Sequence, residues 1–122
     1  MNDKINILIA DDHMVVRRLI LAILRRKPYV NEIYEAKSGK DAVEILKTKK
    51  VDMLLCDNVM PDGDGMHVLE FLKEEKIVIP TLMFSNNNDS KTELLEYGAN
   101  DFLHKPITDV ALLSKIEQFL DI

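Results

Sequence analysis

The chain has 122 residues, of which 47% are hydrophobic and 30% charged, so we expect residues 1–122 to form one ordinary globular domain. Its formal charge of −5 argues against a nucleic-acid binder, which usually carries a basic surplus. The single cysteine, Cys56, excludes an intrachain disulfide, and its place in an apolar run is typical of a buried thiol in a reducing compartment.

The apolar run Ile5–Ala10 is too short for a signal peptide and leads straight into two acids. No apolar run is long enough to span a bilayer. We therefore expect a cytoplasmic protein without a membrane contact.

The elements of the first half follow from hydrophobic periodicity and helix-capping residues. In chain order they are a strand over Ile5–Ala10, a helix over Met14–Arg26, a polar edge strand over Asn31–Ala36 and a helix capped by Ser38. Those of the second half are a buried strand over Val51–Asp57, a helix from Met66 to about Lys76, a strand from near Pro80 to Ser85, a helix opened by Ser90 and Glu93 and ended by Gly98, a strand over Asn100–His104 and a helix capped by Thr108.

Five strands thus alternate with five helices. Because crossovers between parallel strands are right-handed, this alternation predicts an α/β fold with one doubly wound, five-stranded parallel sheet covered by helices on both faces. Strands buried on both faces read as continuous apolar runs, and the first, third and fourth strands do.

Polar side chains stand at the carboxyl ends of four of these strands, where open parallel sheets place their ligands. They are Asp11, Asp12, Asp57, Ser85 and Lys105. Three acids at one edge repel each other unless a cation neutralises them, and oxygen ligands suit Mg²⁺. The lack of a clustered Cys and His set in the sequence argues against zinc.

Ser85 and Lys105 would add a hydroxyl and an ammonium group that could hold phosphoryl oxygens while a carboxylate attacks phosphorus. Aspartate is a covalent acceptor of phosphoryl groups, which makes Asp57 the candidate. Each residue alone is more often structural, and Asp11 and Asp12 could equally cap the following helix. The five side chains together indicate phosphoryl transfer.

With these residues the chain resembles the receiver domain of two-component response regulators, including the stand-alone chemotaxis type, over essentially its full length. The residues that carry the resemblance are Asp11-Asp12, Asp57 with Met60-Pro61 and Gly65, Ser85, and Lys105-Pro106. The resemblance implies a flavodoxin-like sheet of strand order 2-1-3-4-5. It also implies a cis peptide bond between Lys105 and Pro106.

By the same resemblance, Asp57 would accept a phosphoryl group from a histidine kinase or a histidine phosphotransfer protein. Asp12, Asp57 and the backbone carbonyl of Val59 would ligate Mg²⁺, Asp11 would hold the metal's waters, and Lys105 would contact the phosphoryl group. The protein would then be a phosphoacceptor that assists its own phosphorylation and dephosphorylation, not an enzyme acting on a separate substrate.

Ser85 and Phe102 match the family's switch pair, and they would change the face made by the fourth helix, fifth strand and fifth helix. A plain core role for Phe102 is an equal alternative. The expected partners are the phosphoryl donor and a downstream protein target or output domain, without a direct nucleic-acid contact. The sequence leaves open whether phosphorylation drives a dimer, and whether the chain is a complete single-domain regulator or part of a longer protein.

Several positions depart from the family pattern. Asn86 is larger than usual and could narrow the phosphoryl pocket, Gly63 could leave its loop more mobile, and Asn58 stands where an apolar residue is common. Val59 and Asn87 occupy positions that tune dephosphorylation, and because Val59 cannot orient a water we expect a long-lived phosphoryl group. We expect His13 to lie at a helix N-terminus without a metal role.

Three other protein classes are alternatives. A pseudo-receiver, acting as an interaction module without phosphorylation, is the main alternative. A haloacid-dehalogenase-like phosphatase would need a second acid where Val59 stands. A flavodoxin-like flavin binder would need a hydroxyl-rich loop after the first strand, where this chain has two acids.

Overall fold

The structure of the protein is a computed structural model that describes residues 4–85 and 91–122. The strands are β1 (Ile5–Ala10), β2 (Val30–Ala36), β3 (Met53–Asp57), β4 (Thr81–Ser85) and β5 (Asp101–His104). The helices are α1 (Met14–Leu24), α2 (Gly39–Thr48), α3 (Gly65–Glu74), α4 (Lys91–Glu96) and α5 (Asp109–Leu120). The predicted cap Ser90 and the departures Asn86 and Asn87 lie outside the described residues.

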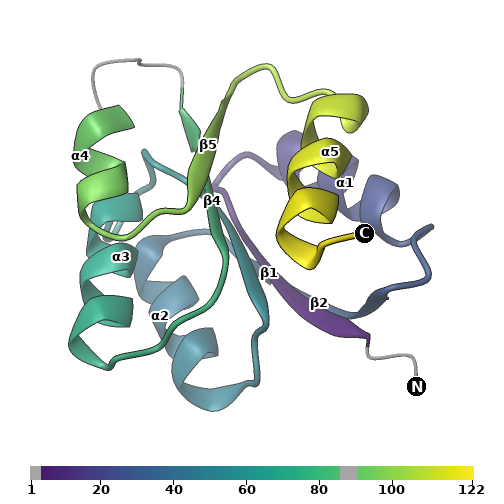
Figure 1. Cartoon of the computed structure of the whole chain (residues 1–122). Coiled ribbons are helices and arrows are strands. Elements are labelled where there is room, and N and C mark those ends of the chain that lie inside the picture. The colour runs from purple at the N-terminus through teal and green to yellow at the C-terminus, as the bar shows by residue number, and fades with distance from the viewer. Residues whose placement is uncertain (1–3, 86–90) are drawn as a thin grey trace.

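The five strands pair in parallel in the order β2-β1-β3-β4-β5, which confirms the predicted fold and the edge position of β2. Figure 1 shows the sheet between two groups of helices, with α2, α3 and α4 on one face and α1 and α5 on the other. The carboxyl ends of the strands lie at the upper edge of the sheet in this view. No helix among the described residues is long and apolar enough to cross a membrane.

Alternate residues of each inner strand supply two separate hydrophobic cores, because successive side chains of a strand point to opposite faces. In β1, Leu8 and Ala10 belong to the core under α2 and α3, while Ile7 and Ile9 belong to the core under α1 and α5. Every residue of β3 and β4 is buried. Apolar side chains are therefore needed on both faces, which is why these strands read as unbroken apolar runs.

Most element boundaries agree with the sequence prediction, and the differences have local causes. Helix α1 ends at Leu24 instead of Arg26, because Pro28 disfavours helical backbone at Lys27 and the chain leaves the helix in a turn from Leu24 to Lys27. The predicted caps Ser38 and Thr108 each accept a backbone N–H of their helix. An unpredicted cap, Asp64, does the same for α3.

The loop after β3 is tied to the start of α2. The N–H groups of Gly39 and Lys40 donate to the carbonyls of Gly63 and Asp62, at 2.8 and 2.9 Å. Gly63 has a φ of 95°, and a Cβ on Gly39 would meet the Gly63 carbonyl oxygen. Gly63 thus has a structural reason that the sequence did not reveal, namely its left-handed backbone and the close approach of its loop to the start of α2.

Candidate functional site

The upper edge of the sheet holds three carboxylates, Asp11, Asp12 and Asp57, hereafter the acid cluster. Asp57 is the last residue of β3, and Asp11 and Asp12 follow the neighbouring strand β1, whose Ala10 pairs with Cys56. Asp11 is fully buried and Asp57 is 4% exposed, whereas Asp12 is exposed. Burying two carboxylates side by side is unfavourable unless a positive charge lies among them.

Lys105 provides one such charge from the loop after β5. Its Nζ lies 2.9 Å from Asp57 Oδ2, to which it donates a hydrogen bond, and 3.1 Å from Asp11 Oδ2. The peptide bond between Lys105 and Pro106 is cis, as predicted. The contact to Asp11 is close enough for an ion pair, but Asp11 Oδ2 makes no hydrogen bond of good geometry and is fully buried.

The electrostatics of the cluster follow from burial and from these contacts. Burial raises the pKa of Asp57, the hydrogen bond from Lys105 lowers it, the charge of Asp11 raises it again, and the net pKa is above its ordinary value. For Lys105, burial lowers the pKa, but the hydrogen bond to Asp57 and the close contact with the carboxylate of Asp11 outweigh burial and raise it. Three carboxylates against one ammonium leave an excess of negative charge that a divalent cation would neutralise.

The acid cluster has the donors that such a cation needs. One ligand atom each from Asp11, Asp12, His13 and Asp57 lies within 4.8 Å of the others. Asp11 Oδ2 is buried and accepts no hydrogen bond, although Lys105 Nζ lies 3.1 Å away. Carboxylate oxygens suit hard divalent cations such as Mg²⁺, so these residues could hold one.

His13 lies closer to the acids than the sequence led us to expect. Its backbone N–H donates to Asp11 Oδ1, and its ring Nδ1 lies 3.0 Å from the same oxygen. Nδ1 also lies 3.4 Å from Asp12 Oδ1 and 3.9 Å from Asp57 Oδ2. The sequence predicts His13 at a helix N-terminus, which its N-cap position confirms. The sequence predicts no metal role for His13, although its position next to Asp12 is a signal of its closeness to the acids.

Val59 lies in the loop after β3, Ser85 is the last residue of β4, and Phe102 lies in β5. The N–H of Val59 donates to Asp57 Oδ1, while its side chain is exposed. Ser85 is buried at the end of β4, and its carbonyl accepts the N–H of Lys105. Phe102 pairs with Met83 in the middle of β5 and is half-buried at the edge of the core under α2 and α3. The roles we assigned to these residues remain predictions.

A buried arginine behind the acids was missed at the sequence level. Arg17 is 6% exposed, and its Nη1 donates to the backbone carbonyl of Asp11 at 2.8 Å. Its Nε donates to Glu35 of β2 at 3.3 Å. Arg17 therefore fixes the backbone of the loop that carries Asp11. The sequence signal for its burial was its helical spacing with the core residues Ile20 and Leu24.

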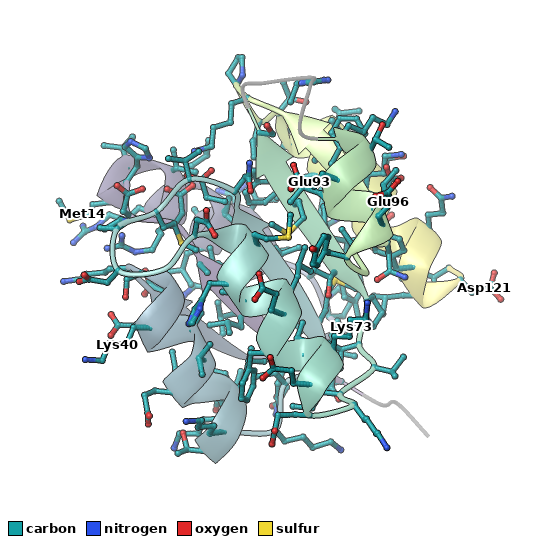
Figure 2. The ribbon with its side chains drawn as sticks, turned by 90° about the vertical axis from the view of Figure 1, so that its left-hand side faces the viewer. Met14, Lys40, Lys73, Glu93, Glu96 and Asp121 are labelled. Carbon is teal, nitrogen blue, oxygen red and sulfur yellow. The ribbon has the colours of Figure 1, made fainter. Side chains whose placement is uncertain are left out.

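Two hollows of the described surface are lined by residues other than those of the acid cluster. One of about 450 Å³ lies between the ends of α3 and α4 and the start of β4, and it is lined mostly by apolar side chains that include Leu72 and Ile79. Figure 2 looks onto this side of the molecule, with Lys73 on α3 and Glu96 on α4 at its rim. Neither the acid cluster nor Lys105 contributes a side chain to this hollow.

Comparison with known proteins gives the family. Residues 7–117 match the family described as the response regulator receiver domain. The chain belongs to this family.

The receiver domain is 34% identical over 105 residues to protein-glutamate methylesterase/protein-glutamine glutaminase 2 of Methanosarcina mazei, an alignment that covers 84% of this chain and 29% of that protein. It is 29% identical to the alkaline phosphatase synthesis transcriptional regulatory protein PhoP of Bacillus subtilis, over 98% of this chain and 49% of PhoP. The chain thus spans less than half the length of these two relatives.

Among solved structures, the response regulator domain of Thermotoga maritima CheB superposes on this receiver domain with a TM-score of 0.85 and 28% identity, over 98% of both chains. The match to a whole response regulator domain agrees with the five-stranded fold described above.

Proposed function

We propose that Asp57 of this receiver domain accepts a phosphoryl group from the phosphohistidine of a histidine kinase or a histidine phosphotransfer protein, in a Mg²⁺-dependent reaction. The observation that carries the proposal is the contact of one buried ammonium, on Lys105, with the two buried carboxylates of Asp57 and Asp11. An ion pair that only stabilises the fold needs one acid. Two acids around one lysine, at the edge of the sheet where parallel sheets bind ligands, suit the transfer of an anionic phosphoryl group.

In the proposed reaction a carboxylate oxygen of Asp57 attacks phosphorus and forms a new O–P bond. The P–N bond of the donor phosphohistidine breaks, its electron pair stays on the imidazole nitrogen, and solvent protonates that nitrogen. Lys105, already within hydrogen-bond distance of Asp57, would hold one phosphoryl oxygen. Ser85, whose backbone accepts the N–H of Lys105, would place its hydroxyl against another.

Asp12, Asp57 and the backbone carbonyl of Val59 would hold Mg²⁺, with Asp11 on the metal's waters. When bound, Mg²⁺ would neutralise the developing charge on the phosphoryl oxygens. Val59 presents an exposed apolar side chain beside Asp57, which cannot orient an attacking water. The phosphoryl group should therefore persist for longer than seconds.

We propose further that residues 1–122 act as one receiver domain in the cytoplasm, and that Ser85 and Phe102 couple Asp57 to the face of α4, β5 and α5. That face would control a downstream protein or an output domain, with no nucleic-acid contact of its own. Ser85→Ala should leave phosphorylation largely intact but reduce the phosphorylation-dependent changes in the NMR spectrum of this face. Full changes in Ser85→Ala would contradict the assignment of Ser85 as a switch residue.

The direct test is the intact mass of the protein after incubation with acetyl phosphate, with and without Mg²⁺. We expect a Mg²⁺-dependent gain of one phosphoryl group in the wild type and none in Asp57→Asn. The matched control is Asp64→Asn, because Asp64 lies in the same loop and asparagine retains its helix cap to the N–H of His67.

An unmodified wild type would favour a pseudo-receiver that binds its partner without phosphorylation. A gain of mass that survives in Asp57→Asn would mean that another residue is the acceptor.

A further inference from the structure

We infer that the imidazole of His13 is a further ligand of the acid cluster, which makes this a mixed nitrogen and oxygen site that prefers late first-row divalent cations, such as Ni²⁺ and Zn²⁺, more strongly than an all-oxygen site would. The inference shares one element with the proposed function, namely the three carboxylates of the acid cluster as metal ligands, and to that extent it rests on the proposed function. It adds a ligand and a metal preference that the proposed phosphoryl transfer does not require.

The separations between the ligand atoms fit a shared cation. His13 Nδ1 lies 3.0 Å from Asp11 Oδ1, 3.4 Å from Asp12 Oδ1 and 3.9 Å from Asp57 Oδ2. An octahedral cation with ligands at about 2.1 Å places neighbouring ligand atoms about 3.0 Å apart and opposite ones about 4.2 Å apart. The separation from Asp11 matches that of neighbouring ligands and the separation from Asp57 is close to that of opposite ligands, while the 3.4 Å separation from Asp12 lies between the two values.

His13 has no competing role at the helix that would explain where its ring points. It occupies the N-cap position of α1, but its side chain makes no capping hydrogen bond. The side chain is 61% exposed, so the ring is held on one side by the acids and is open to solvent on the other. A cation could therefore reach Nδ1 without rearrangement of the core.

A simple hydrogen bond from Nδ1–H to Asp11 Oδ1 is the alternative explanation of the 3.0 Å contact. That bond would use Asp11 Oδ1 alone, and the buried Oδ2, which has no hydrogen bond, lies 3.1 Å from Lys105 Nζ. A metal ligand instead needs the tautomer with its proton on Nε2, so that the lone pair of Nδ1 faces the acids. The two explanations therefore differ in what removal of the ring does to metal affinity.

Imidazole nitrogen suits Zn²⁺, Ni²⁺ and Cu²⁺, whereas carboxylate oxygen alone suits Mg²⁺ and Mn²⁺. Almost any protein site binds Ni²⁺ more tightly than Mg²⁺, so a higher affinity for Ni²⁺ does not by itself show that His13 is a ligand. The quantity that decides is the change in Ni²⁺ affinity relative to Mg²⁺ affinity when His13 is replaced.

We would titrate the full chain with Mg²⁺ and, separately, with Ni²⁺ by calorimetry, in the wild type and in His13→Ala, His13→Asn and His67→Ala. We expect both His13 variants to lose at least about tenfold in Ni²⁺ affinity, since even loss of a residue that supports a metal ligand costs roughly 10–100-fold. Mg²⁺ affinity should change less than about twofold. Asparagine tests the alternative, because it keeps a hydrogen-bond donor for Asp11 but is a poor ligand for Ni²⁺.

His67→Ala is the matched control, because His67 is also an exposed histidine at the start of a helix but is not among the residues gathered around the acids. Its replacement should leave both affinities unchanged. As an independent readout, addition of Zn²⁺ should shift the ¹⁵N resonance of Nδ1 in His13 and leave those of His67 and His104 in place.

Equal Ni²⁺ affinity in the wild type and His13→Asn, or an unshifted His13 resonance, would overturn the inference. If the wild type also takes up a phosphoryl group with Mg²⁺, only the His13 assignment fails and the proposed function stands. If Ni²⁺ binding depends on His13 but no phosphoryl group is taken up, the inference stands and the proposed function fails.

Discussion

The two ends of the sheet use polar side chains in opposite ways. At the amino ends of the strands, polar side chains pair with backbone groups: Asp52 accepts the N–H of Asn6, and Asn100 accepts the N–H of Thr81, each at 2.8 Å. At the carboxyl ends, Asp11, Asp57 and Lys105 contact one another, and one buried carboxylate oxygen has no hydrogen bond.

The two ends therefore differ in how their polar residues affect folding stability: those at the amino ends stabilise the fold, and those at the carboxyl ends destabilise it. A side chain that accepts a backbone N–H near the start of a strand satisfies that donor and stabilises the protein. Two carboxylates buried around one ammonium have a desolvation cost that their attraction to it does not fully offset. The buried charges at the carboxyl ends thus lower the folding stability of the protein, as expected for a site that binds a charged group.

The largest expected effect is at the carboxyl end. Lys105→Met leaves the buried carboxylates of Asp11 and Asp57 facing each other without a cation, and removal of one partner from a buried ion pair costs roughly 3–5 kcal/mol. We expect the free energy of unfolding to fall by about 3 kcal/mol, measured by urea denaturation in the presence of a chelator. A loss below about 1 kcal/mol would mean that the two ends do not differ as described.

A smaller loss is expected at the amino end. The side chain of Asn6 donates to the carbonyl of Lys50 and accepts from Asn31 and from the N–H of Glu32. Asn6→Ala should lower the free energy of unfolding by about 2 kcal/mol, since each hydrogen bond contributes roughly 0.5–1.5 kcal/mol and these are solvent-accessible. Asn31→Ala, which loses one of the three bonds, is the graded control, and neither loss should depend on added Mg²⁺.

Neutralising an acid at the carboxyl end is expected to raise the free energy of unfolding instead of lowering it. The pKa of Asp57 is raised in the folded state, so ionisation of Asp57 weakens folding; this penalty is absent below the unfolded-state pKa and complete above the folded-state pKa. Asp57→Asn should therefore stabilise the metal-free protein at pH 7 by on the order of 1 kcal/mol. Denaturation across pH tests this, because the advantage of the variant should disappear as the pH falls through both pKa values.

The smallest effect is expected at the ion pair between Lys115 of α5 and Asp101 at the amino end of β5. The two groups are 2.6 Å apart but both are about one-third exposed, so Lys115→Met should cost less than about 1 kcal/mol, and less again in high salt. Burial acts to raise the pKa of Asp101, but the hydrogen bond from Lys115 and the N–H of Phe102 lower it overall. The contribution should be present at neutral pH and lost as the pH falls through the folded-state pKa of Asp101.

The fold was predictable because each inner strand is an apolar run that stops at a polar residue. The runs that end at Asp11, Asp57 and Ser85 fix both the strands and the edge at which they end, so the meeting of these segments follows from topology. The order of strands and helices along the chain was enough to predict this meeting, because parallel strands bring their carboxyl ends to the same edge of the sheet.

The positions of His13 and Arg17 were not predictable by the same reasoning. Both belong to the start of α1, and which side of that helix meets the acids depends on how the helix rotates as it packs on the sheet. The helical spacing of Arg17 with Ile20 and Leu24 could not indicate that the guanidinium would reach the carbonyl of Asp11. Likewise, the tie between Gly39 and Gly63 joins loops whose approach no local pattern reports.

The buried thiol next to the proposed phosphoacceptor has a practical consequence. Cys56 is fully buried, and burial, together with the charges of Asp57 and Asp11, raises its pKa, so its sulfur is neither accessible nor ionised at neutral pH. Because it is the only cysteine in the chain, a second cysteine placed on the exposed surface of α5, for example at Val110, would be the single thiol open to a maleimide dye. A fluorescent reporter on the proposed switch face can thus be attached without altering the residues around Asp57.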